Sequence, residues 1–402
     1  MFVSRRNVIK QGVAAAVCTG LMPALARASD GQALIAWLRG AEFAQWVRDS
    51  MKTGHVAGLS LAVLDEGRVV HTAGFGHADI ATGRAMTPDT VMNIASVTKT
   101  ITCTAVMQLH EQGKLDLDAP IDERLPLKIR NPAFAGRLIT TRQLLTHTSS
   151  IADGPAYEAS YACGDPQIAL GDWLTGYFTP GGAHYDAKTN FHAWAPGGTW
   201  SYSNVAYGVL GWLVERVSGQ SYAQYCAEHI FTPLGMNHCR FLLAGMDRTT
   251  HATLYSYVDD GRFTNVGVVD PSWTAPKQGA ALVPHCLYSF VTMSDGLARC
   301  SAAELARFVM AYAQGGSLDG ARILKPDTVR QILRDQRVHY AEPKPQIQGL
   351  TWRGRDARWG HTGADPGVAT GVEFRPSDGR GLVVLTNISG AKSFSQILER
   401  VF

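Results

Sequence analysis

Charged side chains are scarce in this sequence. Only 18% of its 402 residues are Asp, Glu, Lys or Arg, and 37 basic residues stand against 34 acidic ones, which gives a formal net charge of +3 at pH 7. Nucleic-acid binding draws its affinity from a large basic excess, so we predict no nucleic-acid partner. Hydrophobic residues make up 46%. That content excludes extended disorder. The length of 402 residues predicts two or three domains, or one large core with an inserted subdomain.

Cysteine is also scarce, with seven residues in the chain. This density is far below that of a disulfide scaffold, so disulfides are permitted but not implied, and spacing cannot assign their pairing. The pattern Cys226-x-x-His229 followed by His238-Cys239 resembles a zinc set. However, it lies in a stretch that is predicted to be a helix running into a Pro-Leu-Gly turn. We predict no metal site and no organic cofactor.

The first 28 residues predict an export signal of the twin-arginine type. Ser4-Arg5-Arg6 precedes an uncharged run over residues 11–26, and small residues stand at positions 26 and 28 in Ala26-Arg27-Ala28. Sixteen residues interrupted by glycine and proline fall short of the ~20 that span a bilayer, so we predict no stable membrane span after signal cleavage. Without the signal, 33 basic residues stand against 34 acidic ones. We therefore predict a periplasmic or secreted protein.

Strand patterns occur near both ends of the chain, and the middle is mostly helical. The predicted strands are residues 58–64 and 68–73, which form a hairpin, and residues 368–374 and 381–386. The predicted helices are residues 97–113, 205–217, a helix opened by the capping box Ser301-x-x-Glu304, and a closing helix over 394–401. The fold class is therefore α/β (α+β). Residues 29–115 and 280–402 form a sheet-containing lobe, and residues 116–279 form a mostly helical lobe with cleft-lining loops.

Several common hydrolase motifs are absent. The sequence has no G-x-S-x-G, no H-E-x-x-H and no Walker loop, which excludes the usual α/β-hydrolase, zinc-protease and P-loop sites. It does contain Ser96-x-x-Lys99, whose two side chains lie on one face of the helix that begins there. A serine at a helix N-terminus also points its backbone N–H into a region of positive potential, as an oxyanion donor should. The motif alone is weak, because Ser389-x-x-Lys392 matches it too.

Two further motifs follow Ser96-x-x-Lys99 in order: Tyr202-x-Asn204 and His361-Thr362-Gly363. With these, the sequence resembles the serine β-lactamase and penicillin-binding-protein superfamily. The resemblance is to the branch that holds class C β-lactamases, DD-peptidases, D-aminopeptidases and related esterases. It continues in the runs 144–150 and 231–236. It implies a β-lactamase/transpeptidase-like fold, with an antiparallel sheet flanked by helices, an all-helical lobe, and the active site between the lobes.

The resemblance also implies catalytic roles. Ser96 matches the acyl-accepting nucleophile, and Lys99 lies beside it. Tyr202 matches a tyrosine whose phenolate form a neighbouring ammonium favours. The sequence leaves open whether Lys99 or Tyr202 takes the proton of Ser96.

The remaining implied residues bind the substrate. Asn204 is expected to hydrogen-bond Lys99 and the acyl-side amide of the substrate. The backbone N–H of Ala364, directly after Gly363, matches the second oxyanion donor. His361 and Thr362 are expected to border the leaving group. For His147, in Leu-Leu-Thr-His-Thr, we instead predict a hydrogen bond to backbone within the core.

His361 stands where many β-lactamases have lysine. An unperturbed histidine is mostly uncharged at neutral pH, so the motif supplies no permanent cation for a substrate carboxylate, and efficient β-lactam hydrolysis is in doubt. We predict an exported serine hydrolase that forms an acyl-enzyme on Ser96 and cleaves esters or small amides, including D-amino-acid peptides. Two alternatives stay open: a class C-like β-lactamase, and a non-hydrolytic cell-wall or penicillin-binding protein.

Overall fold

The computed structural model describes residues 31–259, 267–276, 279–338, 347–390 and 393–402. The export signal predicted for residues 1–28 lies outside these residues, and it stays a prediction. Among the helices of the described residues, none has the length and hydropathy needed to cross a membrane.

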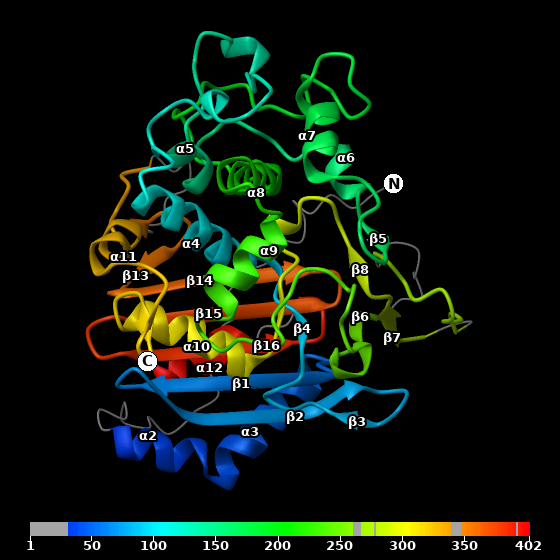
Figure 1. Ribbon diagram of the computed structural model, residues 1–402. Coiled ribbons are helices and arrows are strands. Elements are labelled where there is room, and N and C mark those ends of the chain that lie inside the picture. The colour runs from blue at the N-terminus through cyan, green and yellow to red at the C-terminus, as the bar shows by residue number, and fades with distance from the viewer. Residues whose placement is uncertain (1–30, 260–266, 277–278, 339–346, 391–392) are drawn as a thin grey trace.

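An eight-stranded antiparallel sheet dominates one half of the molecule (Figure 1). Side by side, its strands are β12 (Ile347–Gln348), β13 (Arg353–Arg355), β14 (Arg358–Asp365), β15 (Val368–Arg375), β16 (Arg380–Thr386), β1 (Gly58–Asp65), β2 (Arg68–Asp79) and β3 (Arg84–Ala85). The two chain ends meet where β1 pairs with β16, with Leu59 opposite Thr386. The structure thus confirms the predicted hairpin and the sheet built from both ends of the chain.

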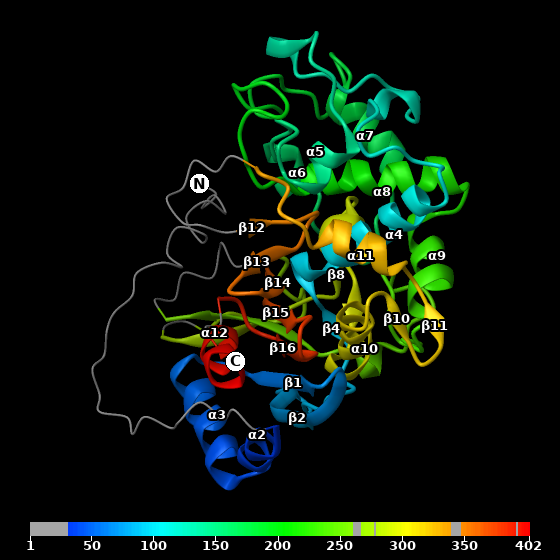
Figure 2. The same ribbon diagram turned by 90° about the vertical axis from the view of Figure 1, so that its left-hand side faces the viewer.

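Helices cover both faces of this sheet because the strand residues alternate between them. On β1, Leu59, Leu61 and Val63 share one core cluster with α2 (Gly31–Leu38), α3 (Ala41–Thr53) and α12 (Ser393–Val401). Ala62 and Leu64 belong to the other cluster, together with α10 (Ala302–Ala313). Figure 2 shows α10 on one side of the sheet and α12 on the other. The predicted closing helix and the predicted helix after Ser301 are both present.

The capping box predicted for α10 forms only in half. The Ser301 side chain accepts the backbone N–H of Glu304 at 3.2 Å. The Glu304 carboxylate accepts instead from the backbone N–H of His238 at 2.9 Å and lies 3.0 Å from the Nδ1 atom of that residue. Glu304 therefore fixes the 238–239 loop. Separately, no cluster of three potential metal ligands occurs among the described residues.

The other half of the molecule is helical. Its helices are α4 (Thr98–Glu111), α5 (Thr141–Leu145), α6 (Pro155–Glu158), α7 (Leu170–Phe178), α8 (Asn204–Ser218), α9 (Tyr222–Cys226) and α11 (Pro326–Ile332). Helix α8 is the central one and packs on α4, α5, α7 and α9. It ends at Gly219, whose φ of +77° is the left-handed conformation that favours glycine. The predicted helices over 97–113 and 205–217 are confirmed, each with slightly different ends.

Eight short strands form four separate two-stranded pairs. They are β4 (Met92–Asn93) with β9 (Arg299–Cys300), β5 (Ala162–Cys163) with β8 (Tyr288–Ser289), β6 (Leu254–Val258) with β7 (Ala281–His285), and β10 (Ser317–Leu318) with β11 (Ala321–Arg322). Strand β6 falls within the predicted helical lobe, yet the backbone N–H of Tyr255 donates to the Asn387 carbonyl directly after β16. The predicted lobe boundaries otherwise stay a prediction.

A disulfide joins Cys163 and Cys286, next to the β5–β8 pair. Four further cysteines are buried free thiols: Cys103, Cys226, Cys239 and Cys300. Burial raises the pKa of Cys226 to about 12, so its thiol stays protonated at neutral pH. The sequence permitted both kinds of cysteine without assigning them.

Replacing both Cys163 and Cys286 by Ser is expected to lower the free energy of unfolding by about 2–5 kcal/mol. The bond joins residues 123 positions apart and thereby restricts the unfolded chain. Urea unfolding with and without reductant measures the effect. Reduced wild type should unfold at the same urea concentration as the double variant. If the urea midpoint of wild type is the same with and without reductant, the disulfide is contradicted.

Candidate active site

Ser96 is an accessible residue in an otherwise buried segment. It lies in the 3₁₀ turn η2 (Ala95–Val97), which leads directly into α4. Among residues 90–109, Ser96 alone is not buried. Ala95 has φ +48°, a left-handed conformation that is rare for a residue with a side chain and is often found at functional sites. The turn thus exposes one hydroxyl at the N-terminus of a buried helix.

The β4–β9 pair sets the position of this turn. Directly after β4, the backbone N–H of Ile94 donates to the Ala298 carbonyl at 2.9 Å. The Ala298 N–H in turn donates to the Thr98 hydroxyl at 3.0 Å. These bonds hold the first turn of α4 against the segment that follows the 3₁₀ turn η8 (Met293–Asp295).

Lys99 is fully buried and lies at the centre of the site. Its Nζ is 3.2 Å from Ser96 Oγ, 2.8 Å from Asn204 Oδ1 and 2.6 Å from the backbone carbonyl of Asp295. The predicted contacts of Lys99 with Ser96 and with Asn204 are therefore both present. The carbonyl and the carboxylate of Asp295 were not predicted to take part.

Asp153 fixes the orientation of Asn204. Its carboxylate accepts the backbone N–H groups of Asn204 and Val205 at the start of α8, and the Ser203 hydroxyl. It also accepts Nδ2 of Asn204 at 2.9 Å. With the amide nitrogen held by Asp153, the amide oxygen faces Lys99. A carboxylate at the N-terminus of a helix is also stabilised by the helix dipole.

Tyr202 faces Lys99 with its ring. Lys99 Nζ lies 4.8 Å from the centroid of the Tyr202 ring and 5.2 Å from that of Tyr207. Tyr202 also packs against His147, with their ring centroids 4.4 Å apart. His147 Nδ1 accepts the backbone N–H of Ser203 at 3.2 Å, which confirms the hydrogen bond to backbone predicted for this histidine.

The third motif lies on β14, where buried and exposed residues alternate. His361, Gly363 and Asp365 are buried, whereas Thr362 and Ala364 are exposed. A Cβ atom on Gly363 would lie 2.6 Å from the Ile94 carbonyl and 3.0 Å from Ala95 Cβ. Only glycine therefore lets this strand approach the turn that carries Ser96. The approach places β14, which carries Ala364, beside the serine turn, and the oxyanion role of Ala364 stays a prediction.

His361 is buried and neutral. Its Nδ1 lies 2.8 Å from the Thr362 carbonyl, so the proton is on Nδ1. Burial, together with the charges of Arg353 and Lys99, holds the pKa of His361 well below its usual range. Its Nε2 is buried and has no hydrogen-bond partner among the residues that the structure describes. The expectation that the motif supplies no cation therefore agrees with the geometry.

A cation lies near the site nevertheless, on the neighbouring strand β13. The Arg353 guanidinium is 5.5 Å from the centroid of the Trp200 ring and 5.8 Å from that of Tyr202. Within the part of the chain that is described, it has no ion-pair partner. The third motif thus supplies no cation, whereas the neighbouring strand supplies one that the sequence analysis did not consider. Nothing in the sequence around Arg353 distinguishes it from other surface arginines.

Two tyrosines of the helical half lie near Lys99. Tyr157 is 1% exposed, and its hydroxyl donates to Asp295 Oδ1 at 3.1 Å. Tyr161 is half-buried and donates to Asp365 Oδ1 at 2.9 Å. Because their hydroxyls lie 3.2 Å apart, the two tyrosines form a hydrogen-bonded chain beside Lys99.

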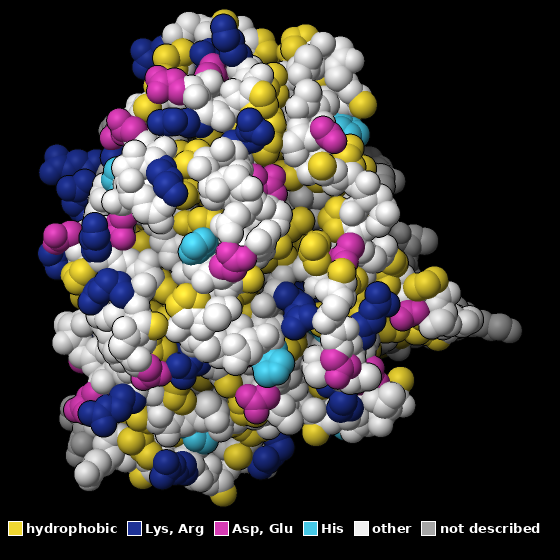
Figure 3. Space-filling model, viewed as in Figure 1, with side chains coloured by type: hydrophobic (Ala, Val, Ile, Leu, Met, Phe, Trp, Pro, Cys, Tyr) yellow, Lys and Arg dark blue, Asp and Glu magenta, His cyan; other side chains and the backbone are white. Residues whose placement is uncertain are grey.

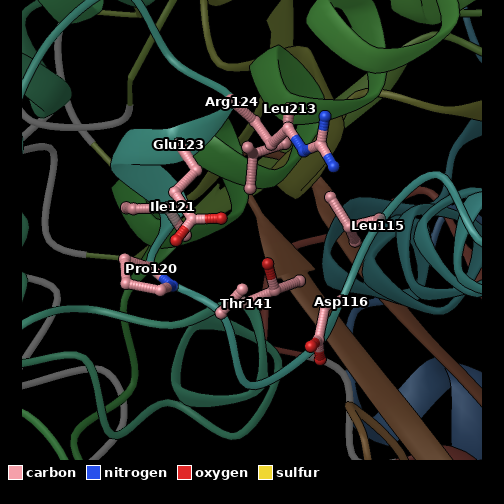
Figure 4. Close-up of a pocket in the computed structure, with 9 residues that line it drawn as sticks. Leu115, Asp116, Pro120, Ile121, Glu123, Arg124, Thr141 and Leu213 are labelled. Atoms are coloured by element: carbon pink, nitrogen blue, oxygen red, sulfur yellow. The ribbon is translucent and has the colours of Figure 1, made fainter.

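The pocket in Figure 4 lies elsewhere. Its volume is about 120 Å³. It is lined by Leu115, Asp116, Ala119, Pro120, Ile121, Glu123, Arg124, Thr141 and Leu213. None of the predicted site residues belongs to it. On the face in Figure 3, basic and acidic side chains intermingle over the surface.

Comparison with known proteins identifies the family. A family model described as Beta-lactamase matches residues 43–401. The chain belongs to the β-lactamase family. Membership supports a serine hydrolase in general, in agreement with the predicted superfamily.

Individual members of this family differ in activity. Esterase EstB of Burkholderia gladioli is 34% identical over 209 residues, which cover 52% of this chain and 52% of the esterase. A penicillin-binding protein homologue from Pyrococcus abyssi superimposes with a TM-score of 0.70 at 24% identity, covering 89% of this chain and 76% of that one. The D-alanine carboxypeptidase AmpC of Burkholderia cenocepacia superimposes with a TM-score of 0.63 at 22% identity, covering 89% of this chain and 99% of that one. The two solved structures establish the β-lactamase/transpeptidase fold that was predicted.

Proposed function

We propose that this protein is an exported serine hydrolase that forms an acyl-enzyme on Ser96 and cleaves esters or small amides, including D-amino-acid peptides. The observation that carries the proposal is the contact of one accessible serine hydroxyl with the buried Lys99, which Asn204 holds in turn. A nucleophile needs a proton acceptor within hydrogen-bond reach, and this arrangement supplies one. The names of an esterase and a carboxypeptidase among similar proteins support the same class.

In the proposed reaction, Ser96 Oγ attacks the substrate carbonyl carbon and loses its proton to Lys99 or Tyr202. The backbone N–H groups of Ser96 and Ala364 hold the developing oxyanion. The bond from the carbonyl carbon to the leaving group then breaks, and the leaving group departs with that proton. Asn204 binds the acyl-side amide, and Thr362 borders the leaving group. Water then attacks the acyl-enzyme, which releases the acid and restores the Ser96 hydroxyl. No step requires a metal or an organic cofactor.

Export is supported by two independent features. Residues 1–28 have the pattern of a twin-arginine signal, and Cys163 and Cys286 form a disulfide, which persists in oxidising compartments such as the periplasm. We propose a periplasmic or secreted location on these grounds.

Arg353 favours substrates that carry a carboxylate. A half-buried guanidinium beside Tyr202, without an acidic partner among the described residues, is suited to bind such a group through paired hydrogen bonds. D-amino-acid peptides with a free C-terminus and β-lactams both have one. Arg353 therefore also supports the second candidate, a class C-like β-lactamase.

An intact-protein mass spectrum before and after exposure to benzylpenicillin separates these candidates. A persistent adduct on Ser96 supports a peptide-recognising hydrolase with slow deacylation. Unmodified protein with intact drug supports esters and neutral acyl substrates, and unmodified protein with consumed drug supports a β-lactamase. An adduct in a protein that hydrolyses neither esters nor D-peptides would instead support the non-hydrolytic penicillin-binding protein.

Replacing Arg353 by Met is expected to lower kcat/KM about 10- to 100-fold for a phenyl ester whose leaving group carries a carboxylate. A hydrogen bond to a charged group contributes about 1.5–3 kcal/mol, and 1.4 kcal/mol is tenfold. The matched control is the same ester without the carboxylate, for which kcat/KM should change less than about twofold on the same grounds. Equal losses on both esters would contradict a carboxylate-binding role.

A further inference from the structure

The short strand pair β5–β8 carries the disulfide of this protein. Cys163 on β5 lies opposite Tyr288 on β8, and its disulfide partner Cys286 lies two residues before Tyr288 (Figure 1). Each of these strands has only two residues, and an isolated pair of that length is not stable in water. The disulfide therefore contributes to holding β5 against β8.

Tyrosines on both strands of this pair contact the turn between β14 and β15. Tyr161 directly precedes β5, and its hydroxyl donates to Asp365 Oδ1 at 2.9 Å. Tyr288 donates to the Pro366 carbonyl, also at 2.9 Å. The Tyr161 ring stacks on Phe290, just after β8, with the ring centroids 4.5 Å apart. The β5–β8 pair thus holds two consecutive residues of the turn.

Asp365 lies next to the predicted oxyanion donor. It is the last residue of β14, directly after Ala364, and is 9% exposed. Because a buried carboxylate needs hydrogen bonds, the Tyr161 hydroxyl fixes the position of the Asp365 side chain. On the other side of Ala364, Gly363 packs against the Ile94 carbonyl. Ala364 therefore lies between two points at which β14 is held.

We propose that Tyr161 is a positioning residue that fixes Asp365 and thereby places the backbone N–H of Ala364 for the oxyanion. The Cys163–Cys286 disulfide keeps Tyr161 in place. The inference rests on the proposed function and concerns how its oxyanion site is kept in shape. Oxyanion donors act mainly on the transition state, so loss of the Tyr161 hydroxyl slows turnover and leaves substrate binding unchanged.

The experiment compares Y161F with wild type on a chromogenic ester. We expect kcat to fall about 10- to 100-fold, because a displaced oxyanion donor costs less than one removed outright. KM should change less than about twofold, since acylation and deacylation both pass through an oxyanion and slow together. Affinity for a phenylboronic acid should fall by the same factor as kcat, because its tetrahedral adduct with Ser96 has an oxygen at the oxyanion position.

The disulfide is tested through the same readouts. C163S/C286S should also show a lower kcat with an unchanged KM, measured at a temperature at which thermal unfolding shows every variant to be folded. If the disulfide acts through Tyr161, kcat of the triple variant C163S/C286S/Y161F should lie within about twofold of the lower of its two parents. Independent effects would instead multiply.

The matched control is Y312F. The Tyr312 hydroxyl is also buried, but it contacts Thr104 on α4 at 2.7 Å. Removing it likewise costs a buried tyrosine one hydrogen bond, without touching the turn after Ala364. Its kcat, its KM and its affinity for the boronic acid should match those of wild type.

An unchanged kcat in folded Y161F would overturn the inference. So would a raised KM with unchanged affinity for the boronic acid, which would place Tyr161 in substrate binding. Losses that multiply in the triple variant would overturn the role given to the disulfide, and if C163S/C286S does not fold, Y161F alone decides. Absence of any turnover by wild type would overturn the proposed function and the inference together.

Discussion

Replacing Ser96 by Ala is expected to reduce hydrolysis by about three to six orders of magnitude, because loss of the nucleophile leaves only substrate binding and the oxyanion donors. The fold should tolerate the change. The side chain is partly exposed and loses one hydrogen bond, to Lys99 Nζ, so the free energy of unfolding should change by about 1 kcal/mol or less. Initial rates on a chromogenic ester and thermal unfolding measure the two effects.

The second S-x-x-K sequence provides a matched control. The Ser389 hydroxyl lies 2.9 Å from Ser256 Oγ and accepts the backbone N–H of Gly367 at 2.7 Å. S389A should therefore keep wild-type activity, and a fluorophosphonate should label Ser96 but not Ser389. Turnover by S96A, or its loss in S389A, would place the nucleophile elsewhere.

The parts of the site that could be predicted from the sequence are those with a local pattern. Ser96 and Lys99 lie one helical turn apart, so their contact follows from the spacing once the helix is recognised. Asn204 and His361 were found because their motifs follow in an order typical of a known superfamily. The strands of the sheet were found because apolar residues alternate along them and turns separate them.

The residues that the sequence did not indicate are those brought in by tertiary packing. Asp153 lies 51 residues before Asn204, and Asp295 lies 196 residues after Lys99. A single carboxylate in a loop or a 3₁₀ turn has no signature of its own. Arg353 is likewise one arginine among many until β13 places it beside Tyr202. The need for glycine at position 363 also becomes visible only when β14 lies against Ile94.

Replacing Lys99 tests both the chemistry and the stability of the site, because the side chain is a fully buried cation. In K99M, kcat/KM is expected to fall by about 10³-fold or more, which lies within the range for a group that moves or controls a proton in the reaction. The same change removes a hydrogen-bond donor from Asn204 Oδ1 and from the Asp295 carbonyl, and an ion-pair partner from the Asp295 carboxylate. Breaking a buried ion pair costs about 3–5 kcal/mol, so K99M should also be less stable at pH 8.

The double variant K99M/D295N separates these two effects. Without Lys99, an ionised Asp295 is a buried charge with no opposite partner, and replacing it by Asn removes that charge. At a pH high enough to ionise Asp295, the double variant should therefore unfold at a higher urea concentration than K99M, while its activity stays as low as that of K99M. The gain should shrink as the pH falls, because Asp295 then takes up a proton; without Lys99, which lowers the pKa of Asp295, this uptake occurs at a higher pH than in wild type. If K99M lost activity only through partial unfolding, the double variant would regain activity along with stability, and Lys99 would have no role in the chemistry.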